Sequence, residues 1–295
     1  MTESRKKVIF TNPCRSCLMR KNQTKRWHPT KIVEVIDNDL TTSTSPIIVL
    51  TDKGTGYFKV LENKEGANAL AREFIGTALA SWFGLSTFAY CLFDFDGTQE
   101  MTLHDGSPVN KGIGFMTRKE SGVNWDQTTT MLDKVINTDD ITRLVCFDTL
   151  VRNTDRYCIH NGKSHLNLTN VFITTSLKKR PALKAMDFTH AFPGSLDNTM
   201  DNVKKVCDEN IYGLFPQFVG FLKKDIAISA CKRFRKLRDK TARRYVEAIP
   251  HSWNIGTETR EAWIRFIVQR AAFVANNFLR LSNLDNSYLI GGKTT

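Results

Sequence analysis

The sequence predicts an α+β fold of two lobes, with a small lobe of strands plus one helix and a larger, mostly helical lobe. Three observations support this prediction. The first third alternates short apolar segments with turn residues and contains one long helical pattern. Helical periodicity dominates the remainder, and one pair of short strands interrupts it between residues 170 and 187. We therefore expect a basic N-terminal segment at 1–30, a first lobe at 31–118 and a second lobe at 119–285.

Length and composition are those of an ordinary soluble globular protein. A chain of 295 residues with 41% hydrophobic and 24% charged residues can bury a proper core. No apolar run approaches the ~20 residues that span a bilayer. The first ten residues lack the apolar core of a signal peptide. These features predict a cytoplasmic protein that makes no use of a membrane.

The net charge of +12 is concentrated in two segments. Residues 1–31 contain nine Lys or Arg against one acid, and residues 223–244 contain ten against two. Such clusters can bind RNA, DNA or an acidic protein surface. The alternative for the second segment is a solvated helix face.

The seven cysteines lie mostly among apolar neighbours, which suits reduced thiols in a core. Cys14 and Cys17 form one CxxC pair. Half a zinc site without a second pair is a weak signal, and the nearest histidine, His28, is isolated. Metal binding there stays open beside the alternative of a loop with two ordinary thiols.

The first lobe begins with three predicted strands. Residues 31–36, KIVEVI, are predicted as the first strand, residues 47–50 are wholly apolar, and residues 57–61 form the third strand. A loop rich in Ser and Thr, 37–46, separates the first two strands. Residues 52–56 form a hairpin turn with two glycines.

The third strand carries a lysine between apolar neighbours, Lys59. The helix predicted at 66–83 has an apolar stripe and ends before Gly84, a natural C-terminal stop. Glu73 lies beside that stripe, 14 residues after Lys59. A strand Lys paired with a helix Glu holds the α- and β-phosphates of ATP in protein kinases. Glu65, at the helix start, is a competing partner.

A second group of polar residues lies between Phe147 and Phe192. A helical run ends at Asn153-Thr154-Asp155-Arg156, Asn170 directly precedes an apolar strand at 171–173, and Asp187 ends a strand at 182–186. An acid on a loop, an Asn at a strand start and a second acid after a hairpin form a phosphotransfer constellation. One acid takes the hydroxyl proton, while the Asn and the other acid hold Mg²⁺ against the phosphates of ATP.

Between these two groups the sequence predicts strands at 86–95 and 112–116 and a helix from 139 to 150. The second of these strands lies where the linker of a kinase receives the adenine ring. We therefore expect Phe115 and Met116 to contact ATP.

The last third is predicted to be helical. One long basic helix has an apolar face from Leu222 to Tyr245, and Pro250 ends it. A final helix follows at 263–278, and its aromatic stripe is expected to belong to the core. Strands first and helices afterwards give the two-lobe plan of a kinase-like fold.

Five segments and the C-terminal helices together resemble the HipA-like kinases, bacterial relatives of the protein kinases and phosphoinositide kinases. The similarity covers residues 31–280, and the helical part of it is VEAIPHSWNIGTETREAWIRFIVQRAAFV. The five segments are GYFKV, NALAREFIGTALASWFGL, FDTLVRNTDR, TNVFI and LKAMDFTHAF.

The resemblance implies a role for each polar residue by its position. Asp155 resembles the catalytic acid that accepts the proton of the substrate hydroxyl. Asn170 and Asp187 resemble the ligands of Mg²⁺. Lys59 resembles the lysine that contacts the ATP phosphates, and Glu73 the residue that orients it.

Two features depart from the family pattern. Asn170 follows Asp155 by fifteen residues, which is longer than in relatives. The inserted segment also contains Asn161 and Asn167, so either could be the metal ligand instead. We prefer Asn170 because it immediately precedes an apolar strand.

The second departure is the absence of a GxGxxG motif before Lys59. The Thr/Ser-rich loop at 41–46 can take its place, because its backbone N–H groups and hydroxyls can reach phosphate. We expect Ser43, Thr44 and Ser45 to contact ATP there. HipA-like kinases are phosphorylated on Ser in this region, and Ser43-x-Ser45 resembles that loop. Autophosphorylation at Ser43 or Ser45 would then be inhibitory.

Other polar residues near these positions are open. Arg156 either binds a phosphate or fixes the catalytic loop, and the alternative is an ordinary structural ion pair. His165 and His190 are expected to be surface or packing residues rather than ligands.

Taken together, the resemblance implies an ATP- and Mg²⁺-dependent kinase that phosphorylates Ser or Thr on a protein. It further suggests a toxin or defence kinase with an antitoxin or regulatory partner and a translation-related, RNA-bound substrate. A lipid or small-molecule kinase, a nucleotide-binding pseudokinase adaptor and a basic RNA-binding protein are the alternatives.

Overall fold

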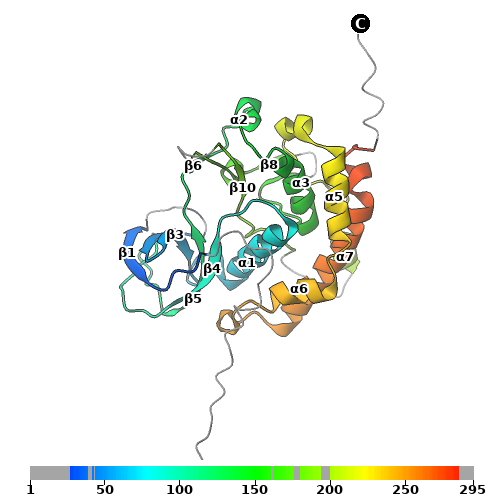
Figure 1. The fold of residues 1–295 in the computed structure, drawn as a ribbon. Helices are drawn as coiled ribbons and strands as arrows, with labels where there is room; N and C mark the ends of the chain where they lie inside the picture. The colour runs from blue at the N-terminus through cyan, green and yellow to red at the C-terminus, as the bar shows by residue number, and fades with distance from the viewer. Residues whose placement is uncertain are drawn as a thin grey trace, which may run out of the picture.

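The computed structural model describes most of the chain and has the predicted two-lobed α+β arrangement (Figure 1). The N-terminal basic segment up to residue 26, with Cys14 and Cys17, lies outside the described residues. The described residues are 27–38, 42, 44–160, 163–175, 180–193 and 200–285.

The small lobe is a five-stranded antiparallel sheet in the order β1-β2-β3-β5-β4. β2 and β3 are joined by a tight turn in which Gly54 has a φ of 102°, a conformation that favours glycine. β3 is the central strand of the sheet, and its last residue, Lys59, pairs with Phe115 of β5. The strands are β1 Ile32–Asp37, β2 Ile47–Thr51, β3 Gly54–Lys59, β4 Tyr90–Phe95 and β5 Gly112–Arg118.

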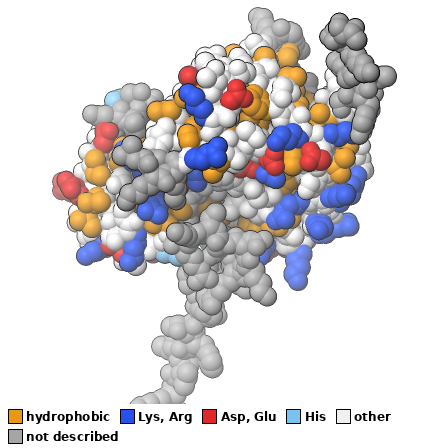
Figure 2. All heavy atoms as spheres, turned by 45° about the horizontal axis from the view of Figure 1, so that its top comes forward, with side chains coloured by type: hydrophobic (Ala, Val, Ile, Leu, Met, Phe, Trp, Pro, Cys, Tyr) orange, Lys and Arg blue, Asp and Glu red, His pale blue; other side chains and the backbone are white. Residues whose placement is uncertain are grey.

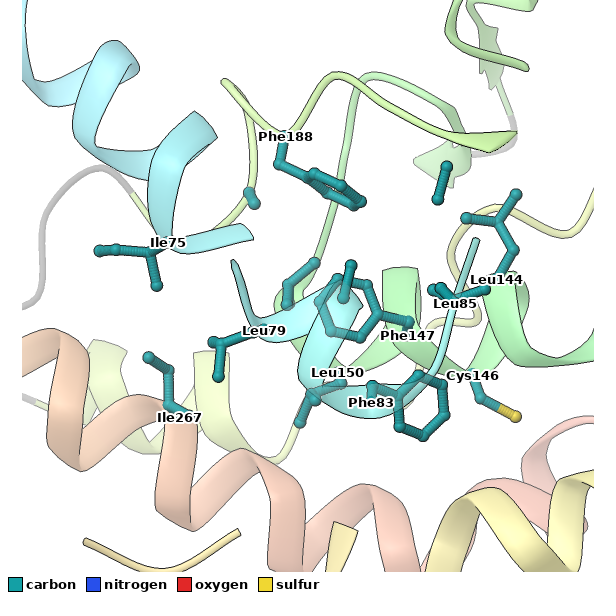
Figure 3. Close-up of a cluster of buried hydrophobic side chains, with 14 of the residues drawn as sticks. Ile75, Leu79, Phe83, Leu85, Leu144, Cys146, Phe147, Leu150, Phe188 and Ile267 are labelled. Carbon is teal, nitrogen blue, oxygen red and sulfur yellow. The ribbon is translucent and has the colours of Figure 1, made fainter. Parts of the chain in front are cut away.

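The helix α1, Gly66–Phe83, has the predicted bounds and ends at Gly84, which takes a left-handed conformation with a φ of 97°. It is packed mainly against the large lobe. Figure 3 shows Ile75, Leu79 and Phe83 of α1 facing side chains of the large lobe. The ring of Phe83 stacks on Phe147 and Phe234, with centroids 5.7 and 4.7 Å away. Burial of each such side chain stabilises the fold by about 1.5–3 kcal/mol, so α1 ties the sheet firmly to the helices.

The large lobe is organised around α7, which packs on α3, α5 and α6. Its apolar side chains recur at helical spacing and are buried, as predicted for the final helix. The helices of this lobe are α2 Thr129–Asp133, α3 Asp139–Val151, α4 Met200–Val206, α5 Lys224–Phe234, α6 Asp239–Val246 and α7 Thr257–Leu281.

The prediction of a single long basic helix up to Tyr245 is wrong. The chain forms two helices, α5 and α6, with a turn between Phe234 and Asp239. Apolar spacing did not reveal the break, because Phe234 and Ala242 are eight positions apart and would share one face of a continuous helix. The turn is closed by the N–H of Leu237, which donates to the carbonyl of Phe234 at 2.8 Å.

Two small sheets complete the large lobe. β6, Gly122–Asn124, pairs with β9, Val171–Thr174, and β9 pairs with β10, Leu183–Ala185, so the predicted hairpin between 170 and 187 is present with an added strand. A separate two-stranded hairpin is formed by β7, Tyr157–His160, and β8, Lys163–Leu166.

Lys and Arg side chains gather along the right edge of the molecule in Figure 2, the side on which α5 and α6 lie in Figure 1. The exposed cations of this corner include Lys232, Arg235, Lys236, Arg238 and Lys240. In the parts of the chain that the structure describes, no helix combines the length and apolar composition needed to span a bilayer.

Candidate active site

Lys59 and Glu73 form an ion pair between β3 and α1. Lys59 Nζ lies 3.8 Å from Glu73 Oε1, and both side chains are largely buried. Glu65 is the N-cap residue of α1 and makes no such ion pair with Lys59 among the described residues. Burial of the ammonium opposes its charge, but Glu73, Asp187 and Glu65 together raise the pKa of Lys59 above its usual value. Lys59 is therefore a fixed cation next to two acids.

The second oxygen of Glu73 connects the pair to the segment after Asp187. The backbone N–H of Phe188 donates to Glu73 Oε2 at 2.6 Å. Phe188 is buried against α1, and Gly76 makes the approach possible, since a Cβ at position 76 would lie 2.3 Å from Phe188 Cβ. The ring also packs on Phe147, with centroids 5.4 Å apart. The position of Asp187 is thus coupled to α1.

Asp187 follows β10 and has a left-handed backbone with a φ of 57°, which Asp tolerates better than most residues. The N–H and hydroxyl of Thr189 donate to Asp187 Oδ1 at 3.3 and 2.8 Å. Burial acts to raise the pKa of Asp187, but Lys59, Thr189 and Arg156 outweigh it and lower that pKa below its usual value. The site therefore holds an ionised carboxylate beside the Lys59 ammonium.

The fourteen residues between Asp155 and Asn170 are largely taken up by the β7–β8 hairpin. The hairpin leaves the loop after Arg156 and returns to it, where the N–H of Asn167 donates to the carbonyl of Arg156 at 2.9 Å. Asn170 Nδ2 consequently lies 2.7 Å from Asp155 Oδ2. The long insertion does not misplace the Asn.

Asn167 also reaches Asp155, with its Nδ2 2.9 Å from Oδ2, so both candidate metal ligands touch the same acid. Their amide oxygens differ. Asn167 Oδ1 accepts hydrogen bonds from the N–H and hydroxyl of Thr169. Asn170 is 2% exposed, and its Oδ1 accepts no hydrogen bond from any residue that the structure describes. The donor set favours Asn170, while Asn161 lies outside the described residues.

Asn170 Oδ1 and the Asp187 carboxylate fit a hard divalent cation such as Mg²⁺, which prefers oxygen ligands and completes its shell with phosphates and water. The amide of Asn170 can serve both partners at once, because its Nδ2 is bonded to Asp155 while its Oδ1 remains available.

Arg156 is a structural cross-link and not a phosphate ligand. Its side chain is fully buried and pairs with Asp148 of α3, Nε to Oδ2 at 2.6 Å. The guanidinium also donates to the carbonyls of Asn170 and of Met186, the latter at 2.6 Å. One side chain thus joins the Asp155 loop, the start of β9 and the turn that carries Asp187.

Two residues of this scaffold were missed in the sequence. Asn153 is buried, and its Nδ2 donates to Asp148 Oδ1 at 3.3 Å and to the Asp187 carbonyl at 3.2 Å. Asp148 is fully buried within the apolar run of α3. A charged residue inside such a run was the signal that could have identified it, because buried acids need a partner.

The Ser/Thr loop before β2 is only partly described. Thr44 and Ser45 are buried, and Ser45 Oγ donates to the carbonyl of Thr42 at 3.1 Å. The hydroxyl of Ser45 is therefore engaged within the turn. The predicted phosphate contact and modification at Ser43 lie outside the described residues.

The expected contact of ATP with Phe115 and Met116 is not supported, because both side chains are 0% exposed. β5 lies between β3 and β4, and both of its faces are covered. Phe115 packs on Phe74 of α1 with centroids 6.0 Å apart, and Met116 belongs to the apolar cluster on the opposite face. The segment after β5, residues 119–121, instead connects the sheet to β6.

The family of this chain follows from a comparison with known protein families. The sequence matches the HipA-like kinase family over residues 32–281. This chain belongs to the HipA-like kinase family. Its fold is that of a protein kinase, and the family makes it a phosphotransferase that uses ATP.

The fold is similar to that of the proinflammatory kinase CtkA of Helicobacter pylori, with 12% identity and a TM-score of 0.52 over 88% of this chain and 97% of CtkA. The PknI kinase domain of Mycobacterium tuberculosis also matches, with 14% identity over 81% of this chain and 95% of that domain. Its TM-score of 0.27 is too low to support an argument. No curated protein sequence matches this chain significantly.

Proposed function

We propose that this kinase transfers the γ-phosphate of ATP to a Ser or Thr hydroxyl of a protein. The observation that carries the proposal is the meeting of two acids, a lysine and an asparagine in one connected network, joined by Arg156. In the order of the chain, these are the parts that phosphoryl transfer requires.

The role of each residue follows from its surroundings. Lys59, a cation fixed by Glu73, binds the α- and β-phosphates. Asn170 and Asp187 hold the divalent metal, which when bound neutralises charge on the phosphates. Asp155 orients the acceptor hydroxyl and accepts its proton. The hydroxyl oxygen forms a bond to the γ-phosphorus as the bond from that phosphorus to the bridging oxygen of ADP breaks.

The test is an acceptor assay with ATP labelled on its γ-phosphate. Wild-type protein is offered cell-lysate protein, lipid extract or buffer, and labelled proteins are hydrolysed to identify the phosphorylated amino acid. We expect label on Ser or Thr of lysate protein. Label only in the lipid extract would make the chain a lipid kinase, and stabilisation by ATP–Mg²⁺ without turnover would make it a pseudokinase.

Autophosphorylation of the loop before β2 is a second part of the proposal. Phosphate at Ser43 or Ser45 would add negative charge near the place of the ATP phosphates and lower activity. Since the Ser45 hydroxyl is buried in a turn, modification there requires that turn to open. Mass spectrometry of wild type beside Asp187→Asn is the test, and equal phosphate on both would contradict autophosphorylation.

The partners follow from the family and from charge. We propose a toxin or defence kinase acting in the cytoplasm on a translation-related protein, with an antitoxin as a regulatory partner. The exposed cations at the α5–α6 corner support a target that carries RNA. Binding of an RNA-bearing target should weaken steeply with salt, and no binding at low salt would remove this part.

A further inference from the structure

Asp155 is contacted by a histidine that the proposed reaction does not use. His165 Nε2 lies 3.2 Å from Asp155 Oδ1, and an ionised carboxylate only accepts hydrogen bonds, so the ring nitrogen is the donor. The other oxygen, Oδ2, is bonded by the amides of Asn167 and Asn170 at 2.9 and 2.7 Å. Three side chains therefore hold one carboxylate.

His165 belongs to the inserted hairpin and points to the Asp155 side because of the strand register. Residues paired across two strands share a face, and His165 pairs with Cys158. Cys158 Sγ donates to the carbonyl of Thr154, the residue before Asp155, at 3.3 Å. Leu166, the next residue along β8, lies on the opposite face of the hairpin and is exposed. A one-residue change of register would turn His165 away from Asp155.

The two oxygens of Asp155 are not equivalent. Each carboxylate oxygen has two lone-pair directions, and the two amides occupy both directions of Oδ2. Among the described residues Oδ1 has one partner, His165, and so retains a direction for a second hydrogen bond. Oδ1 is therefore the oxygen that can receive the proton of an acceptor hydroxyl.

We propose that His165 is a positioning residue for phosphoryl transfer. Its N–H fixes the rotation of the Asp155 carboxylate so that Oδ1 faces the acceptor hydroxyl. The β7–β8 hairpin thereby contributes a side chain that positions the catalytic acid. This inference rests on the proposed function for its catalytic meaning, while the contact itself can be tested separately.

His190 does not have the same role. Its Nδ1 is 4.0 Å from Asp155 Oδ2, the oxygen that two amides already occupy. The same nitrogen is 3.1 Å from the hydroxyl of Thr189, which donates to Asp187. His190 is thus associated with the Asp187 turn.

The kinetic test compares His165→Ala with His165→Gln. The Ala variant removes the donor, and we expect kcat to fall roughly 10- to 50-fold with KM for ATP unchanged, because misorientation of a catalytic group costs rate and not binding. The Gln side chain can supply an N–H near the position of Nε2 and should restore most of the rate. His251→Ala, at an exposed histidine of a different element, is the matched control and should keep the wild-type rate.

Three results would overturn the proposal. They are a wild-type kcat for His165→Ala, a kcat for His165→Gln no higher than that of His165→Ala, and a raised KM for ATP with an unchanged kcat. Urea unfolding of each variant shows whether the hairpin change has affected the fold. A fall in kcat that tracks lost stability would make His165 merely structural.

A second measurement does not depend on activity. The imidazole ¹⁵N resonances of wild type should show a proton on Nε2 of His165, and the Asp155→Asn change should shift that resonance because the charged acceptor is gone. An unchanged Nε2 resonance would overturn the contact. If wild type shows the contact but transfers no phosphate to any acceptor, the proposed function fails while the geometric part of this inference stands.

Discussion

Asp155 and Arg156 are neighbours in the chain, yet they lie in opposite environments. The Asp155 side chain is 21% exposed, and its partners are all side chains, one of them the exposed His165. The Arg156 side chain is fully buried, and apart from Asp148 its hydrogen-bond partners are backbone carbonyls of separate segments. The buried side of the loop, at Arg156, is therefore rigid, and the partly exposed side, at Asp155, is available for chemistry. Stability and chemistry should be separable by mutation on the two sides.

Removing the buried Arg156 side chain should have the largest effect. Arg156→Ala leaves Asp148 buried and unpaired, and breaking a buried ion pair in this way costs about 3–5 kcal/mol. We expect the free energy of unfolding in urea to fall by that amount and phosphate transfer to be lost with the fold. Arg118→Ala, at an exposed arginine at the end of β5, should change it by less than about 0.5 kcal/mol.

A double variant sharpens this result. Asp148→Leu with Arg156→Met removes both charges, so no buried charge is left unpaired, and it should be less destabilised than Arg156→Ala. Equal destabilisation of the two would show that the carbonyl contacts, and not the ion pair, hold the loop.

Among the side chains proposed to carry out the chemistry, loss of charge should affect the reaction and not the fold. Asp187→Asn removes a charge from the proposed metal site, and we expect transfer to fall about 10²- to 10³-fold, as for the loss of one preorganised electrostatic contact. Circular dichroism should remain that of wild type. A variant that retains full ATP consumption would contradict the metal assignment.

Gly76 lets Phe188 approach α1, where the N–H of Phe188 donates to Glu73. A methyl group added there would collide with Phe188 and push it away from Glu73. Gly76→Ala should cost about 1–3 kcal/mol of stability by overpacking and lower the transfer rate as well. Gly220→Ala is the control, since nothing lies within 4 Å of its added Cβ. Wild-type rates for Gly76→Ala would show that the Phe188 contact is unnecessary.

The smallest expected effect is a dependence of stability on pH. The folded-state pKa of Asp187 lies below the unfolded value of about 3.9, so its charge contributes stability that is present above that pH. The contribution is lost as pH falls through the folded-state pKa. The stability difference between wild type and Asp187→Asn should therefore be constant near neutrality and change only below about pH 4. A difference that varies between pH 6 and 8 would contradict this assignment.

Much of the rigid part was predictable because periodicity fixes it. The apolar stripe of α1 determines which side of the helix Glu73 occupies, and the strand pattern around Lys59 determines the partner sheet. The placement of Asn170 was likewise predictable despite the long insertion, because the apolar strand that follows it, β9, and not its spacing from Asp155, locates the residue.

Other features were missed for identifiable reasons. The hairpin at β7–β8 had a sequence signal, Asn161-Gly162 between alternating residues, which is typical of a tight hairpin turn. The burial of Phe115 and Met116 depends on what covers each face of β5. Phe74 of α1 packs on Phe115, and Met116 belongs to a cluster with Trp27, which is distant in the chain. The contact of His165 with Asp155 depends on hairpin register, which periodicity alone does not set.

The central claim is tested most directly by Asp155→Asn, with ATP–Mg²⁺ binding and phosphate transfer measured on the same preparation. In the proposed mechanism Asp155 acts on the acceptor hydroxyl and not on the nucleotide, so we predict an unchanged Kd for ATP. Transfer should fall about 10²- to 10⁴-fold, the range for loss of a general base. Transfer at the wild-type rate, or loss of ATP binding in step with loss of transfer, would contradict the account.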